Sequence, residues 1–149
     1  MGGGWISGFR NQLKNVSWCK FLASKGLATA TIDYRLAMLN SMEDILQDYT
    51  DALNFVKANA IKLEIDKNDI VLMGLSAGGH LALLYASYYS FLKQNDKLEG
   101  IKGVSAYYSP SNLRDLFGKE QKSLFARFAA ITTLKGSPNK KPVQYSYYS

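Results

Sequence analysis

The chain has 149 residues, of which 47% are hydrophobic and 20% are charged, and its formal net charge is +6. This length and balance predict one soluble globular domain with a sizeable core. The single cysteine, Cys19, excludes an internal disulfide, and no cysteine–histidine cluster suggests a metal site.

Targeting and charge signals are weak. No apolar run approaches the length of a membrane span, and the N-terminus lacks the charged start and apolar core of a signal peptide. We therefore expect a cytoplasmic location. Basic residues are enriched at both ends of the chain, but they form no tight run and accompany no nucleic-acid-binding motif. We expect neither a nucleic-acid partner nor a cofactor.

The first half of the chain predicts a loop, two helices and a strand. Gly2 to Gly8 form a glycine-rich loop, and apolar spacing predicts a helix over residues 11–24. Residues 27–32 are expected to form a strand that leads into Asp33. Residues 40–59 give the clearest amphipathic helix, which Ser41 and Asp44 begin with a capping box.

That amphipathic helix carries a row of carboxylates. We interpret them as a solvated face that favours the positive helix start, and not as an acid–base or metal site. The residues are Glu43, Asp44, Asp48 and Asp51.

The second half of the chain alternates strands and helices. Residues 70–73 predict a buried strand, and the helix after it, which runs through Phe91, is apolar on nearly all sides. Residues 101–107 predict a second strand, and residues 116–134 predict a helix. Residues 143–148 are expected to lead toward a further strand. This alternation predicts an α/β fold with a mostly parallel sheet flanked by helices.

The sequence Gly74-Leu75-Ser76-Ala77-Gly78 lies between the first of these strands and its helix. A serine on such a turn is held in a strained conformation with its hydroxyl raised above the sheet, so we predict Ser76 as a nucleophile. The alternative is a glycine-rich turn whose serine only caps the helix. A phosphate-binding loop is excluded, because it needs a lysine where this chain has His80.

Three segments, in this order, resemble those of α/β-hydrolase esterases and lipases similar to hormone-sensitive lipase. Met1-Gly2-Gly3-Gly4-Trp5 is similar to the His-Gly-Gly-Gly-Trp oxyanion loop, with methionine in place of histidine. Asp33-Tyr34-Arg35-Leu36-Ala37 resembles the segment that closes the next strand. Gly74 to Ala82 matches the nucleophile turn almost residue for residue.

The resemblance implies a single partial α/β-hydrolase domain over residues 1–149, truncated at both ends, that acts on small-molecule carboxylic esters. Ser76 would attack the ester, and the backbone N–H groups of Gly2, Gly3 and Ala77 would bind the oxyanion. The region after residue 116 corresponds to the part that often covers the active site in this family.

The acid and base of the family's catalytic triad come from beyond the point where this chain stops. His80 matches a position in the buried helix, so we interpret it as a core residue. Asp33, Asp96 and Asp115 are candidate substitutes, although Asp33 matches a structural position that pairs with Arg35.

In this fold a further strand, which the chain lacks, lies between residues 27–32 and the strand before Ser76. We therefore expect exposed strand edges and self-association through them. Two functions stay open at this point. One is a serine esterase whose triad acid and base are missing from this chain, and the other is a non-catalytic truncated pseudo-hydrolase or interaction module.

Overall fold

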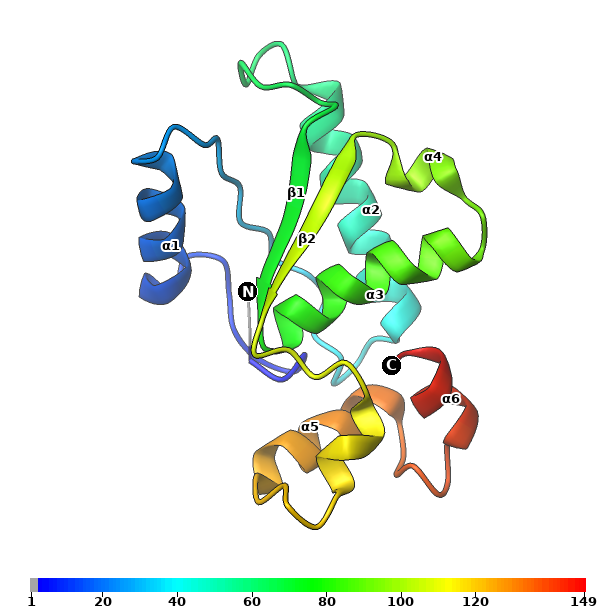
Figure 1. Ribbon diagram of the computed structural model, residues 1–149. Coiled ribbons are helices and arrows are strands. Elements are labelled where there is room, and N and C mark those ends of the chain that lie inside the picture. The colour runs from blue at the N-terminus through cyan, green and yellow to red at the C-terminus, as the bar shows by residue number, and fades with distance from the viewer. Residues whose placement is uncertain (1–2) are drawn as a thin grey trace.

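A computed structural model describes residues 3–149 of the chain (Figure 1). Its elements follow one another in this order: α1 (Leu13–Ala23), α2 (Met42–Ala58), β1 (Ile70–Leu75), α3 (Ala77–Phe91), α4 (Asn95–Leu98), β2 (Ile101–Tyr107), the 3-10 helix η1 (Leu113–Phe117), α5 (Leu124–Leu134) and α6 (Pro142–Tyr147).

The two strands β1 and β2 are parallel neighbours in one sheet. Their register runs from Ile70 opposite Ile101 to Leu75 opposite Tyr107. Parallel strands need a crossover connection, and α3 with α4 supplies it while α3 packs against both strands (Figure 1). The predicted α/β class, with a parallel sheet flanked by helices, is confirmed.

The core lies between the sheet, α3 and α2. Helix α3 buries nine of its 15 residues, most of them in its first half, as its apolar composition predicts, whereas Phe91 at its end is 79% exposed. Aromatic rings join it to α2. The Tyr85 ring lies 5.9 Å from that of Tyr49 and 4.8 Å from that of Tyr89, between ring centroids.

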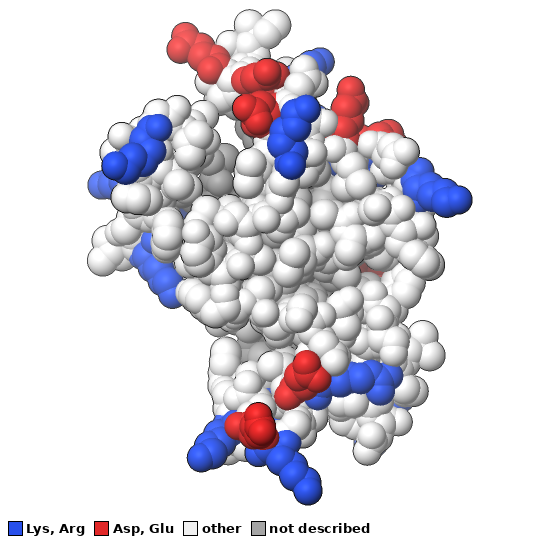
Figure 2. Space-filling view, in the orientation of Figure 1, with Lys and Arg blue, Asp and Glu red and all other residues white. Residues whose placement is uncertain are grey.

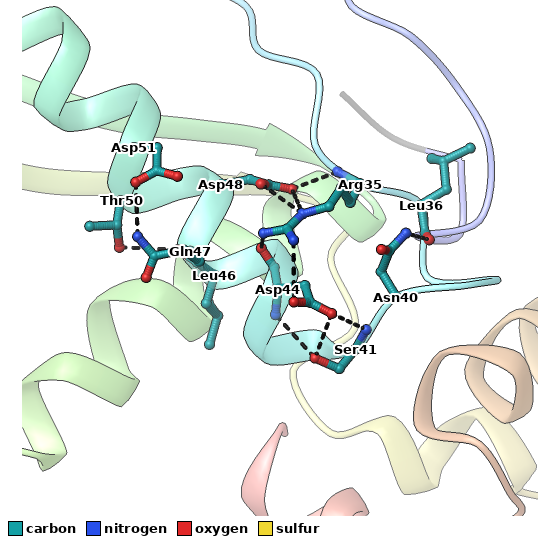
Figure 3. A network of polar contacts seen from close by, with 10 residues as sticks. All are labelled: Arg35, Leu36, Asn40, Ser41, Asp44, Leu46, Gln47, Asp48, Thr50 and Asp51. Atoms are coloured by element: carbon teal, nitrogen blue, oxygen red, sulfur yellow. Dashed lines mark hydrogen bonds and ion pairs between the residues drawn. The ribbon is translucent and has the colours of Figure 1, made fainter.

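Helix α2 begins at the predicted capping box. Asp44 N–H donates to the Ser41 hydroxyl, and Ser41 N–H donates to the Asp44 carboxylate at 2.8 Å. Arg35 binds two carboxylates of the predicted solvated acidic face, and the Asp44 side chain remains 42% exposed in this ion pair (Figure 3). The guanidinium of Arg35 contacts Asp48 at 3.0 Å and Asp44 at 3.3 Å.

The expected pairing of Asp33 with Arg35 is wrong. Asp33 accepts the backbone N–H of Arg10 at 2.6 Å and pairs with the Arg10 guanidinium at 3.5 Å. Arg35 turns to α2 because Asp44 and Asp48 lie one helical turn apart there and accept from one guanidinium.

Residues 27–32 do not form the predicted strand. A strand needs a neighbour to bond its backbone groups, and β1 pairs only with β2 among the described residues. The segment runs apart from β1 after α1, and Leu27 at its start is 56% exposed (Figure 1). The segment therefore stays without regular secondary structure despite its apolar composition.

One prediction for the last third of the chain also needs correction. The helix expected over 116–134 is divided into η1 and α5, because Gly118 ends η1 and the Ser123 hydroxyl caps a new helix by accepting the Ala126 N–H. The tail that the sequence analysis expects to lead toward a further strand is itself helical and forms α6. Pro142 favours this because its fixed φ suits the first turn of a helix.

Within residues 3–149, no helix is both long enough and apolar enough to cross a membrane.

The sheet leaves apolar surface uncovered. Val71 is 59% exposed and Tyr107 is 44% exposed, although Trp18 of α1 packs against the Tyr107 ring. Charged side chains gather at the top and bottom of the view in Figure 2 and leave the band between them largely white. The self-association expected from the sequence stays a prediction, and we propose that it uses this sheet.

We expect Val71→Lys to reduce self-association, because a charge on an exposed strand opposes pairing with another chain. Light scattering against protein concentration would measure it. Val143→Lys is the matched control, since Val143 is 71% exposed on α6, away from the sheet. Equal association by both variants and the parent chain would contradict the use of the sheet.

Candidate active site

Ser76 stands on a strained turn between β1 and α3. Its φ of 51° and ψ of −122° lie in a region that residues other than glycine rarely adopt, and this backbone conformation costs about 1–3 kcal/mol. Two backbone bonds fix the turn, Ser76 N–H to Tyr107 O at 2.9 Å and His80 N–H to Ser76 O at 3.0 Å. The Ser76 side chain makes no capping hydrogen bond, so the capping interpretation is wrong.

Glycines allow the strand and helix to meet at this turn. A Cβ on Gly74 would lie 2.1 Å from the carbonyl carbon of Gly78, and one on Gly79 would lie 2.9 Å from Gly74 O. Only glycine permits such a close approach of the backbones. The close approach brings the first turn of α3, with Ala77 fully buried, to the end of β1.

The loop before α1 has an unusual backbone. Gly3, Gly4 and Trp5 have φ values of 116°, 62° and 64°, and Ser7 closes the turn by donating its N–H to Gly3 O at 3.1 Å. A Cβ on Gly4 would lie 2.9 Å from the Cβ of Ala129 on α5. Of the predicted oxyanion donors, Gly3 belongs to this loop, and Gly2 lies outside the described residues.

Trp5 fastens this loop to the helix that follows Ser76. The indole N–H of Trp5 donates to Nδ1 of His80 at 3.1 Å, and the two rings meet edge to face with centroids 5.3 Å apart. Trp5 O also accepts the backbone N–H of Ala37 at 3.0 Å.

His80 is a buried residue, as predicted. It is 2% exposed, and its Nε2 lies 2.7 Å from the carbonyl oxygen of Tyr148. Burial lowers the pKa of His80 to about 4, although the hydrogen bond to Tyr148 opposes this change. At neutral pH the imidazole is uncharged.

A cleft of about 540 Å³ opens in front of Ser76. Gly4 and Trp5 line it on one side, and the segment from Tyr108 to Ala126 supplies the rest of its wall. This wall includes part of the region that the sequence analysis placed over the active site. It mixes apolar groups with polar ones, and the polar ones are Ser109, Ser111, Asn112, Asp115, Gln121 and Ser123.

The three aspartates considered as triad substitutes lie in different surroundings. Asp115 lines the cleft and accepts a hydrogen bond from Asn112 at 2.9 Å. Asp33 binds Arg10, and Asp96 lies on α4 with a side chain that is 75% exposed. Asp115 is therefore the one of the three that shares the cleft with Ser76.

Sequence reasoning missed several groups at the cleft. Ser109 is one, and its buried hydroxyl has no hydrogen-bond partner within residues 3–149. Gly4 and Trp5 were noted only as parts of a motif. The signal for Ser109 was its place directly after β2, since residues at the carboxyl ends of parallel strands gather at one edge of the sheet.

Among the described residues, no group of three or more histidine, cysteine, aspartate or glutamate side chains is placed to hold a metal ion.

The parallel strands, their crossover helix and the turn between them put this chain in the α/β-hydrolase class, in partial form. Residues 1–148 match the BD-FAE family, an esterase type of this fold, and the chain belongs to that family. No solved structure gave a significant match.

Several curated relatives carry esterase names. A probable isoprenylcysteine alpha-carbonyl methylesterase ICME of Oryza sativa subsp. japonica is 35% identical over 128 residues, which cover 78% of this chain and 30% of the relative. The Arabidopsis thaliana isoprenylcysteine alpha-carbonyl methylesterase ICME is 31% identical, over 78% of this chain and 25% of the relative. Esterase LipC of Mycobacterium tuberculosis is 35% identical, over 56% of this chain and 20% of the relative. The chain thus spans less than a third of the length of each of these proteins.

We expect Gly74→Ala to destabilise the fold by about 3 kcal/mol or more, because its Cβ would meet backbone and not a side chain that can move. Urea unfolding would measure this change. Gly103→Ala on β2 is the matched control, since a Cβ there meets no atom within 4 Å. Equal midpoints for the two variants would contradict the close approach at Gly74.

Proposed function

We propose that this chain carries the nucleophile of a serine esterase, with Ser76 attacking carboxylic esters. The observation that carries the proposal is the strained Ser76, whose hydroxyl is not used to cap α3 and which lines an open cleft. Strain of this kind persists only where surrounding structure enforces it, and it clusters at functional sites. The esterase names of the relatives support the same class of reaction.

The reaction would proceed through an acyl-enzyme. The Ser76 oxygen forms a bond to the ester carbonyl carbon and loses its proton to a base, and the carbonyl becomes an oxyanion. The intermediate then expels the alcohol, which takes up a proton, and water later releases the acid by the same steps.

The oxyanion would be bound by backbone amides. Ala77 N–H lies at the start of α3, where the first amides have no partner within the helix and the helix dipole favours negative charge. Gly3 N–H would donate from the loop that Trp5 holds, and Gly2 is carried over from the family resemblance alone. One such donor is worth about 3–4 kcal/mol of the barrier.

The triad acid and base are not assigned to residues of this chain. His80 is its one histidine, and both ring nitrogens are engaged in the core. A serine without a base is a weak nucleophile, although oxyanion donors alone can preserve slow catalysis. We therefore propose full activity only where a histidine is supplied from outside these residues.

The substrate would be a small carboxylic ester held in the mixed polar and apolar cleft. The two ICME relatives described above are named isoprenylcysteine alpha-carbonyl methylesterases, and this chain covers 30% or less of them. The cytoplasmic location stays a prediction.

Both ring nitrogens of His80 are hydrogen-bonded in the core, so they are not free to act as a base. This favours a second candidate, a non-catalytic pseudo-hydrolase or interaction module that retains the esterase core. This candidate predicts a folded chain with a cleft that binds esters without acylation.

Labelling with a fluorophosphonate probe, read by intact mass, separates the two candidates. The proposal predicts slow, single labelling of the parent chain and none of Ser76→Ala. Ser111→Ala, which removes another serine of the same cleft, is the matched control and is expected to label like the parent.

Labelling of Ser76→Ala at the parent rate would contradict Ser76 as the nucleophile. A parent chain that stays unlabelled, while its near-ultraviolet circular dichroism shows fixed tertiary structure, would favour the non-catalytic candidate.

A further inference from the structure

The hydrogen bond between Trp5 and His80 joins two parts of the site that lie far apart in the sequence. Trp5 ends the Gly3–Trp5 loop and is 3% exposed, and His80 is in the first turns of α3 and is 2% exposed. The backbone N–H of His80 donates to the carbonyl of Ser76 itself. One residue thus bonds to the nucleophile's backbone and to the facing loop.

The partners of His80 determine where its proton lies. An indole N–H only donates, so Nδ1 must accept and carries no proton. The Tyr148 carbonyl only accepts, so Nε2 must carry the proton and donate it at 2.7 Å. The imidazole is therefore neutral and in a single tautomer, and a second proton would place an N–H group against the indole N–H.

The loop needs contacts that hold it in place, and the Trp5–His80 hydrogen bond (the tie) is one of them. Gly3 and Gly4 adopt positive φ readily, whereas Trp5 after them has a φ of 64°, a conformation that a residue with a side chain keeps only when surrounding contacts enforce it. The contacts that do so are the bond to His80, the bond from Ala37 N–H to Trp5 O and the packing of Gly4 against α5. Of these, only the bond to His80 reaches α3, the helix that begins directly after Ser76.

We propose that His80 is a positioning residue, which holds the Gly3–Trp5 loop at the place that oxyanion binding beside Ser76 requires. The proposal rests on the proposed function of Ser76. A displacement of about 1 Å between reacting groups can cost about a hundredfold in rate, so a tie of this kind affects chemistry as well as stability. A histidine that only fills the core would affect stability alone.

Four variants test the tie through the rate of Ser76 labelling, measured on folded protein. Trp5→Phe removes the donor and keeps a ring, and His80→Phe removes both ring nitrogens. The double variant closes the cycle, and His80→Gln restores an acceptor and a donor on a side chain of similar reach. Trp18→Phe is the matched control, because Trp18 is the other tryptophan and packs on α1 against Tyr107.

We expect Trp5→Phe and His80→Phe each to slow labelling by at least about tenfold, or about 1.4 kcal/mol. The double variant is expected to label no more slowly than the slower single variant, because both remove the same bond. His80→Gln should recover part of the rate, and Trp18→Phe should match the parent. Parent-like labelling of folded His80→Phe, or losses that multiply in the double variant, would overturn the proposal.

A second measurement separates this proposal from the function of Ser76. In a Trp18→Phe background the only indole N–H resonance belongs to Trp5, and we expect its NMR shift to move when His80 becomes phenylalanine. An unlabelled parent together with this shift would refute the esterase and leave the tie intact. An unmoved resonance would refute the tie, whatever the labelling shows.

Discussion

The neutral imidazole of His80 is the interaction on which the rest of this site depends. It accepts a hydrogen bond from the Trp5 indole N–H and donates one to the carbonyl of Tyr148. The Tyr148 hydroxyl in turn donates to Glu43 on α2. The N-terminal loop, α3, the C-terminal segment and α2 are thereby connected through a chain of hydrogen bonds. Loss of one partner leaves another buried group unsatisfied, at a cost of about 1–3 kcal/mol.

A second constraint acts on the other side of the cleft. The approach of Gly74 to the backbone of α3 sets the strained turn of Ser76, and the bond to His80 holds the Gly3–Trp5 loop, in which Trp5 has a strained φ of 64°. Both strained segments lie against one cleft, and a two-stranded parallel sheet supports them. Such a sheet is marginal by itself, so helices α2 and α3 supply much of the stability that the strain requires.

Local patterns in the sequence were enough to predict β1, β2, the turn at Ser76 and the capping box of α2, because each depends on neighbouring residues. Pairing between distant residues was not predictable in this way. The composition of residues 27–32 predicts a strand, but the described residues offer it no partner strand. Arg35 pairs with carboxylates of α2 and not with Asp33. His80 was correctly placed in the core, whereas its bond to Trp5 spans 75 positions and left no local signal.

The pH dependence of the unfolding free energy, compared between the parent chain and His80→Gln, tests the neutral His80 most directly. Its pKa in the folded chain is about 4, below the ordinary 6.5. The unfolded chain therefore takes up the proton first, and the stabilisation is complete above about pH 6.5 and is lost as the pH falls toward 4. We predict that the parent loses about 3 kcal/mol more than His80→Gln across this window. Parallel curves for the two proteins would contradict a buried, neutral His80 that holds the site together.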